Sequence, residues 1–285
     1  MTDCKDVLDY YEYPLPDSPL TWYVDCVYFL RSEAGGSYFC VPNGKLGVSL
    51  VLTGHLACQG EDGHPVPLPR AALFGLVTEP VQVHVSAGFS EVAIILKPNG
   101  LQHFTNLSFQ ELMNPGTPLE AVLGSGLTDL HERLGENEEP AARVAMIEKF
   151  LLGRLGDCTA DARVDLAVGE ILRHKGAVTV DGLCRQLRVT PRTLSSLFRE
   201  KVGVSPKVCM QLTRFYNALS YQPAGGCREE TLAGLACALG YYDQAHFIKD
   251  FKRFAGRSPQ RYFSCAPLAV DFRKYRRWLS SNFMN

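Results

Sequence analysis

Polar and basic side chains recur at steps of one and three residues between Arg192 and Arg199, and again between Gln244 and Lys252. If each stretch is helical, this spacing places the polar groups on one face of the helix. Guanidinium, ammonium, amide and hydroxyl groups on such a face can hydrogen-bond base edges or phosphates. The residues expected on the two outer faces are Arg192, Ser195, Ser196 and Arg199 in the first stretch, and Gln244, Ala245, Ile248, Lys249 and Lys252 in the second.

The two stretches belong to an internal duplication. The pattern F-x4-G-x-S-P occurs from Phe198 to Pro206 and again from Phe251 to Pro259, with an offset of 53 residues. An apolar helical pattern, a short turn and a second helical pattern precede each copy, which is the layout of a helix-turn-helix. A solvated helix face explains any single polar residue equally well. Two basic faces at the positions that the geometry requires favour sequence-specific DNA binding instead.

Local signals predict the elements that hold these two faces. We expect Thr190 to cap the first reading helix, with Pro191 at its first position. In the second unit Gly240 takes the turn and Asp243 is the cap. The residues expected to point inward are Val180, Leu183, Cys184, Leu187, Leu194, Leu197 and Phe198 in the first unit, and Leu232, Leu235, Ala236, Leu239, Phe247, Phe251 and Phe254 in the second.

Charge divides the 285-residue chain into an acidic and a basic part, although the whole carries a net charge of only -1. Residues 1–162 hold 9 Lys and Arg against 21 Asp and Glu, whereas residues 163–265 hold 16 against 8. The tail 266–285 is basic and aromatic. Such asymmetry is typical of a chain with one domain that faces nucleic acid. Two unrelated globular domains with ordinary charge scatter are the alternative.

The acidic part is predicted to be β-rich over residues 20–100 and helical over 101–156. Short apolar runs separated by Gly, Pro and Asn turns indicate a sandwich or barrel. The expected strands include Thr21–Leu30, Leu46–Leu52, Ala71–Val77, Val81–Val85 and Val92–Leu96, and the expected helices are Phe109–Leu112, Leu119–Leu134 and Ala141–Leu155. The apolar stripe Val144, Ile147, Leu151 and Leu155 fits either core packing or a dimer contact. The small and polar segment 157–162 is the predicted linker between domains 1–156 and 163–265.

Residues 163–263 resemble the DNA-binding domain of the AraC/XylS transcription regulators. The first unit carries the resemblance in Leu183, Cys184, Leu187, Val189, Thr190, Arg192, Leu194, Phe198, Gly203, Ser205 and Pro206. The second, more diagnostic unit carries it in Leu235, Ala236, Gly240, Tyr241, Asp243, Gln244, Ala245, His246, Phe247, Phe251, Lys252, Gly256, Ser258, Pro259 and Tyr262. The resemblance implies a linker helix over residues 206–221 that holds the two reading helices in successive major-groove segments. Ala245 and Ile248 depart from the polar residues frequent in this family, so the second unit is expected to read fewer bases.

The N-terminal part is similar, more weakly, to a cupin-like effector domain that accompanies one group of these regulators. Residues 41–44, 96–104, 111–114 and 118–120 carry this similarity. It implies an α+β chain: a cupin-like or jelly-roll domain with trailing helices, followed by an all-α domain of two helix-turn-helix units. A small-molecule or protein effector is expected in the first domain. The aromatic residues Trp22, Tyr23, Tyr28 and Phe29 either line a ligand cavity there or fill the core.

Several other classes of protein are not favoured. No run of about 18 apolar residues suggests a membrane span, and acidic residues interrupt the start of the chain where a signal peptide would be apolar. The ten cysteines include no C-x-x-C pair, which favours a reduced, cytoplasmic protein. Redox sensing by Cys26, Cys40 or Cys58 would need an exposed thiol of low pKa. His55, His64, His84 and His103 lack the H-x-H spacing of a cupin metal site, and no nucleophile elbow, phosphate loop or dinucleotide motif occurs.

The sequence therefore predicts a non-enzymatic transcription regulator without metal or cofactor. Its expected partners are promoter or operator DNA, RNA polymerase, an effector and a second copy of the chain. The resemblance favours an activator. The alternative is a nucleoid-type DNA-binding protein without an effector, which would rely on charge rather than on base readout.

Overall fold

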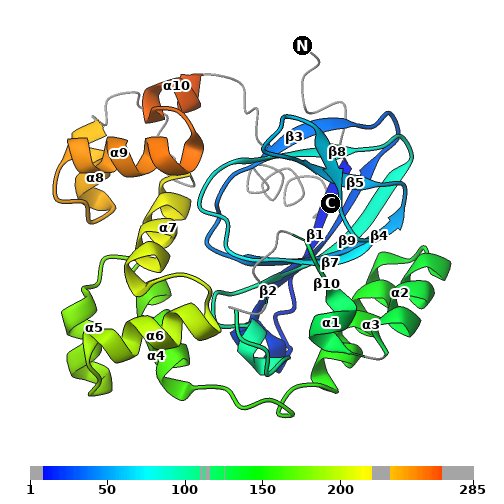
Figure 1. Cartoon of the computed structure of the whole chain (residues 1–285), viewed down its shortest axis with the longest axis horizontal. Helices are drawn as coiled ribbons and strands as arrows, with labels where there is room; N and C mark the ends of the chain where they lie inside the picture. Colours follow the sequence, from blue (N-terminus) through cyan, green and yellow to red (C-terminus); the bar gives the residue numbers. More distant parts are fainter. Residues whose placement is uncertain (1–8, 110–111, 113–115, 125, 220–231, 265–285) are drawn as a thin grey trace, which may run out of the picture.

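Two antiparallel sheets form the N-terminal part of the chain, and helices form the C-terminal part (Figure 1). The computed structural model describes residues 9–109, 112, 116–124, 126–219 and 232–264. This is the α+β arrangement that the sequence predicts. The strands are β1 (Asp9–Tyr13), β2 (Val24–Ser32), β3 (Gly36–Cys40), β4 (Leu46–Thr53), β5 (Leu56–Gln59), β6 (Pro65–Pro67), β7 (Ala71–Phe74), β8 (Val81–Val85), β9 (Phe89–Leu96) and β10 (Thr117–Pro118). The 3-10 helices are η2 (Pro19–Trp22) and η3 (Leu101–His103), and the α-helices are α1 (Leu119–Leu123), α2 (Leu127–Glu136), α3 (Pro140–Leu152), α4 (Ala162–Arg173), α5 (Val180–Leu187), α6 (Pro191–Lys201), α7 (Pro206–Leu219), α8 (Leu232–Ala238), α9 (Gln244–Ala255) and α10 (Pro259–Ser264).

Both faces of the larger sheet are buried. Its strand order is β1-β2-β9-β4-β7-β10, and the smaller sheet has the order β3-β8-β5-β6. Successive side chains of a strand point to opposite faces. In β4, Val48 and Leu50 therefore enter the core that the sheet shares with α1–α3, while Val51 enters the core between the two sheets. Helices α1–α3 thus cover one face and the second sheet covers the other (Figure 1).

Several predicted boundaries in this part differ from the structure. The expected strand Thr21–Leu30 begins at Val24, because Ser18 caps the 3-10 helix η2 by accepting a hydrogen bond from the backbone nitrogen of Leu20. The sheet also starts earlier than residue 20, at β1. The expected helix Leu119–Leu134 is two helices, since Gly124 and Gly126 between them both have positive φ. Of the expected helix Phe109–Leu112, residues 110 and 111 lie outside the described residues, as do residues 111, 113 and 114 of the cupin-like similarity.

The apolar stripe on α3 is core packing. Ile147 and Leu151 are buried in the core that α3 shares with the larger sheet, and Val144 and Leu155 pack against the same core.

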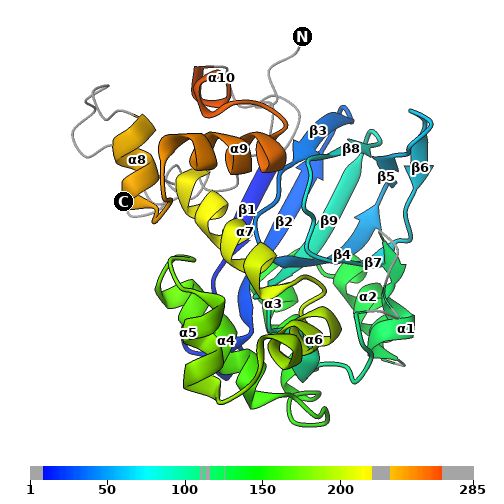
Figure 2. The same ribbon diagram turned by 60° about the vertical axis from the view of Figure 1, so that its left-hand side comes forward.

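The C-terminal helices form two similar groups joined by α7 (Figure 2). Helices α4, α5 and α6 surround one core, to which α7 contributes Cys209 and Met210. Helices α8 and α9 surround a second core, to which the same helix contributes Leu212, Phe215 and Ala218. The linker helix predicted over residues 206–221 is thus helical from Pro206 to Leu219, and residues 220–221 lie outside the described residues.

The predicted caps of both reading helices, α6 and α9, are confirmed. Thr190 Oγ1 accepts a hydrogen bond of 3.1 Å from the backbone nitrogen of Thr193, and Pro191 follows at the first helical position. Asp243 Oδ1 accepts one of 2.7 Å from the backbone nitrogen of His246. Gly240 turns the chain with a φ of 73°. Each cap satisfies a backbone donor that the first turn of a helix leaves without a partner.

Polar bonds from α7 complement its apolar contacts. The buried amide of Gln211 donates to both carboxylate oxygens of the buried Asp250 in α9, at 3.1 Å each. Arg214 donates to the carbonyl oxygen of Gly176, which follows α4, and its guanidinium lies 4.9 Å from the ring centroid of Tyr241. One arginine therefore contacts both helix-turn-helix units.

We expect Gln211→Leu to lower the free energy of unfolding by about 1–3 kcal/mol, because it removes both hydrogen bonds from a buried carboxylate. Urea denaturation measures this loss. The control is Asn217→Ala, since the Asn217 side chain donates only to Thr213 of its own helix among the bonds described; its cost should stay near 0.5 kcal/mol, roughly that of a surface change. Equal costs for the two variants would contradict the structural role of the Gln211–Asp250 bond.

Candidate DNA-binding interface

The first reading helix, α6, presents a polar face opposite its buried face. Leu194 and Phe198 are fully buried in the first helical core. Arg192, Ser196 and Arg199 are exposed, and Ser195 is half-buried. The alternation that the spacing predicts therefore holds along this helix, and the two arginines lie two turns apart on its outer side.

The second reading helix, α9, is built in the same way but is less polar. Gln244, Ala245, Lys249 and Lys252 are exposed. Ile248 is half-buried because it packs against the second helical core. Its side chain is thus partly committed to packing, which fits the expectation that this unit reads fewer bases.

Tyr242 is a candidate contact that the sequence does not single out. It is 94% exposed directly before the cap residue Asp243, whereas the adjacent Tyr241 is only 6% exposed in the core. A fully exposed tyrosine at the start of a reading helix presents both a ring and a hydroxyl group for contact with nucleic acid. The sequence has two consecutive tyrosines at this point, and the direction that the chain takes after the turn at Gly240 determines which of them points outward.

The basic groups of both faces are available to a partner. Within the described part of the chain, no carboxylate lies within ion-pair distance of Arg192, Arg199, Lys249 or Lys252. Unpaired surface cations attract the phosphate backbone and release its counterions on binding. The arrangement therefore suits a polyanionic ligand.

The four aromatic residues proposed as an effector site do not lie together. Trp22 is in η2 and 74% exposed, and Tyr23 stacks on the ring of His103 with 3.7 Å between centroids. Tyr28 and Phe29 are neighbours on β2 and point to opposite faces of the sheet, Tyr28 toward the smaller sheet and Phe29 toward α1–α3. Of the four, only Tyr28 thus lies between the two sheets.

A buried polar group that the sequence does not reveal lies beside Tyr28. The carboxyl of Glu91 in β9 accepts hydrogen bonds from Ser49 Oγ at 2.7 Å and from the Tyr28 hydroxyl at 3.2 Å. Burial raises the pKa of Glu91, and the two hydrogen bonds offset this only in part. The ring of Tyr28 also packs against that of Tyr10, with 5.1 Å between the ring centroids, in the core between the sheets.

Two of the three cysteines considered for redox sensing, Cys26 and Cys40, do not have the thiol chemistry of a sensor, and the half-buried Cys58 stays a candidate. Cys26 is buried, and burial raises the pKa of its thiol well above the usual value. Burial likewise raises the pKa of Cys40 to about 12. Thiols of high pKa react slowly with oxidants, which argues against redox sensing at these two positions.

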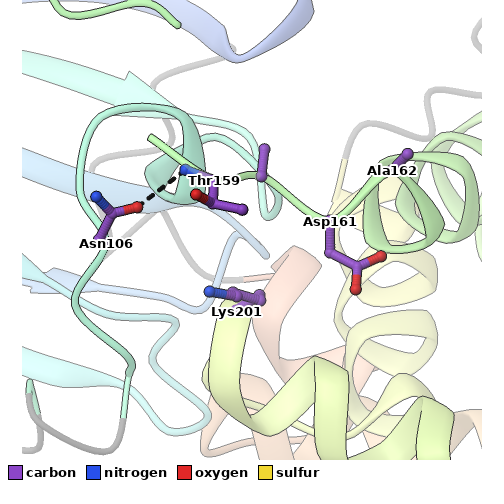
Figure 3. A pocket seen from close by; sticks show the side chains of 6 residues that line it. Asn106, Thr159, Asp161, Ala162 and Lys201 are labelled. Atoms are coloured by element: carbon purple, nitrogen blue, oxygen red, sulfur yellow. Dashed lines mark hydrogen bonds between the residues drawn. The ribbon is translucent and has the colours of Figure 1, made fainter. Parts of the chain in front are cut away.

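An open hollow of about 560 Å3 lies where the segment before α4 passes the N-terminal part (Figure 3). Asn106 accepts a hydrogen bond from the backbone nitrogen of Thr159 on one side, and the Lys201 ammonium lies opposite. The carboxylate of Asp161 accepts hydrogen bonds from Arg163. The remaining lining residues of this hollow are Ala160 and Ala162.

Among the described residues, no three His, Cys, Asp or Glu side chains are grouped as a metal site requires. None of the helices in that part of the chain is long and apolar enough to cross a membrane.

Two protein families match separate parts of this chain. Residues 183–264 match a family described as a helix-turn-helix domain, and residues 12–118 match a domain of unknown function, DUF6597. No curated protein gives a significant match.

Solved structures give only distant likenesses. ToxT from Vibrio cholerae is 12% identical over 93% of this chain and 99% of its own, with a TM-score of 0.44. ToxT with an unsaturated fatty acid bound is 11% identical over 90% of this chain and 94% of its own, with a TM-score of 0.43. An RmlC-like cupin protein from Desulfovibrio desulfuricans is 14% identical over 34% of this chain and 88% of its own, with a TM-score of 0.26. Because all three TM-scores lie below 0.5, these likenesses carry no conclusion about this chain.

The family match covers both reading helices and the helix between them. It agrees with the two capped helices, their exposed basic faces and the duplicated F-x4-G-x-S-P pattern. Residues 183–264 therefore form a helix-turn-helix domain, of the kind that the resemblance to the AraC/XylS regulators predicts.

Proposed function

We propose that this protein is a transcription activator that reads two adjacent major-groove segments of an operator. The observation that carries the proposal is the pair of capped helices, α6 and α9, on one shared helix, each with exposed basic side chains that have no ion-pair partner within the described residues. Two such helices on one rigid support reach successive groove segments about 10 bp apart on one face of the duplex. Recruitment of RNA polymerase follows from the resemblance to AraC/XylS activators.

We further propose that an effector acts through the N-terminal part. The group that supports this is the Glu91 carboxyl with Ser49 and Tyr28, which lies between apolar walls of both sheets. A few polar groups in an apolar surrounding are what small-molecule sites use to orient a ligand. A small molecule with hydroxyl groups fits this chemistry.

The proposed function is tested with an operator obtained by selection: the full chain selects bound duplexes from a random-sequence library. The expected result is one enriched sequence with two conserved segments about one helical turn apart. Footprinting on the selected duplex locates both segments. Selection without enrichment, or equal affinity for operator and random DNA at the same salt concentration, would favour a nucleoid-type protein instead.

Arg192→Ala should lower affinity for the operator by about 1–3 kcal/mol and relax the preference at one base pair, if the guanidinium reads a guanine. Binding to the operator and to its single-base variants measures both effects. Arg133→Ala is the matched control, because Arg133 pairs with Asp129 on α2, in the N-terminal part. An Arg192 variant that binds every duplex as the unchanged chain does would overturn the assigned role of α6.

Lys249→Ala should behave differently if its ammonium contacts a phosphate. Affinity should then fall alike on every sequence, and the slope of log affinity against log salt should flatten by about one unit. A salt titration with operator and random duplexes measures the slope. A loss confined to one base pair would instead assign Lys249 to base readout.

Glu91→Gln should stabilise the protein at neutral and higher pH. Burial raises the folded-state pKa of Glu91 above its unfolded value, so ionisation costs more in the folded protein. The free energy of unfolding then falls as the pH rises through this pKa, and glutamine removes that loss. Thermal unfolding should show a higher Tm for the variant at about pH 8 and the smallest difference at about pH 4. The exposed Glu61→Gln serves as control, and a variant less stable than the unchanged chain at both pH values would contradict this account.

A further inference from the structure

The N-terminal part contacts both helix-turn-helix units at once. Leu76, in the segment after β7, packs against the core of the N-terminal part and against both helical cores. Each helical unit has a core built from its own buried side chains, and Leu76 packs against both cores from outside. A single leucine shared by three cores therefore couples the positions of three bodies.

The N-terminal part contacts the equivalent turn in each helix-turn-helix unit, the one that follows the reading helix. In the first unit, Gly203 follows α6, and a Cβ atom at this position would lie only 2.8 Å from ring atom Cδ1 of Phe109. The backbone nitrogen of Phe109 also donates to the carbonyl oxygen of Glu200, at 2.8 Å. In the second unit, Gly256 follows α9, and a Cβ atom there would lie 3.5 Å from Cγ of Pro80.

These two glycines are equivalent positions of the duplicated F-x4-G-x-S-P pattern. Both have positive φ, 85° and 70°, and each lies within two residues of the end of a reading helix. The N-terminal part thus approaches the carboxyl-terminal end of both reading helices, through residues 80 and 109 of its own chain. Either helix can change its direction only if one of these contacts changes with it.

A polar contact holds the middle of α7. Lys45 pairs with Asp25 and donates to the hydroxyl oxygen of Tyr216 in α7, at 2.9 Å. Its ammonium is also 4.6 Å from the centroid of the Tyr216 ring. The side chain of Lys45 is only 15% exposed, and a charge in such a place depends on its partners.

A second polar contact holds α4. One oxygen of Asp165 lies 2.8 Å from Asn99 Nδ2, 2.9 Å from Gln102 Nε2 and 3.0 Å from His103 Nε2. Asn99 and Gln102 are buried, so each loses a hydrogen bond if α4 moves away. Three donors from one segment of the N-terminal part therefore converge on one carboxylate of the first unit.

We propose that the N-terminal part sets the separation at which the two reading helices engage DNA, with Lys45, Leu76 and Asp165 as the positioning residues. This rests on the proposed function, since it requires that α6 and α9 each read one segment. When the two helices share a fixed support, binding of the second segment is intramolecular and has a high effective concentration at one separation only. When the contacts are loosened, the effective concentration of the second helix falls at the selected separation. At other separations it rises, because the two helices can then reach them.

The experiment uses the full chain and the operator that it selects from random-sequence duplexes. Variants of this operator have one or two base pairs inserted or deleted between the two segments, and one duplex keeps a single segment. In Lys45→Met/Asp165→Asn, the ratio of affinity for the selected separation to affinity for the altered ones should fall about tenfold. Affinity for the single-segment duplex should stay within about twofold of the unchanged chain, which a general loss of structure would not allow.

Leu76→Ala provides an independent variant, because it loosens all three bodies without removing a charge. Asp129→Asn is the matched control: it breaks an exposed ion pair on α2, with Arg133, and should leave the ratio unchanged. Thermal unfolding confirms that each variant is folded at the assay temperature. An unchanged ratio in the folded variants overturns the proposal, as does an equal rise in affinity on every duplex, which would indicate that docking blocks DNA binding. Arg192→Ala is measured on the same duplexes, because it tests base reading and not the separation of the two helices. If Arg192→Ala weakens binding while the ratio stays unchanged, the further proposal fails and the proposed function stands.

Discussion

The arrangement of the DNA-binding domain depends on the burial of α7 in two cores at once. Met210 faces the first helical core and Leu212, two residues later, faces the second. A helix that is apolar on more than one side is stable only between two partners. Between these residues, Gln211 bonds to the buried Asp250 of α9, which fixes the rotation of α9 about its own axis as well as its distance. A large movement of either reading helix would therefore expose part of α7, whereas small changes in their separation are left to the contacts with the N-terminal part.

The contacts of the N-terminal part with this domain include buried polar groups, whereas the two helical cores are apolar. Asp165 has three partners across the boundary and Lys45 has one, Tyr216. Leu76, Phe109 and Pro80 add apolar contacts. Polar contacts of this kind have modest net energies because water replaces them when they open. A ligand in the N-terminal part needs to supply only about 1–3 kcal/mol of differential binding to shift such a boundary. The apolar cores thus keep each helical unit rigid, whereas the boundary with the N-terminal part can shift when a ligand binds.

The sequence predicts most of the helical domain, because its signals are local. The caps Thr190 and Asp243 act within three residues of their own position, so spacing alone finds them. The strand that contains Tyr28 and Phe29 is also found, but strand alternation sends these two rings to different faces, and the sequence cannot assign both to one cavity. Glu91 and its partner Ser49 are 42 residues apart, and Asp165 and its donors are 62–66 apart. Nothing in either segment signals such a pair before the fold brings it together.

The duplicated units share the order of their helices but have different outer faces, and on the proposed function this difference divides their work on DNA. On the proposed function, α6 presents Arg192 and Arg199, whose guanidinium groups can form paired hydrogen bonds with a guanine. The corresponding face of α9 holds Gln244, which can read a base, but also Ala245, the half-buried Ile248 and two lysines, and lysines suit phosphate contacts. Phosphate contacts fix register and orientation, whereas base contacts specify sequence. The first unit then supplies most of the specificity and the second most of the anchoring, so the fixed geometry between them lets one segment of sequence determine where both units bind.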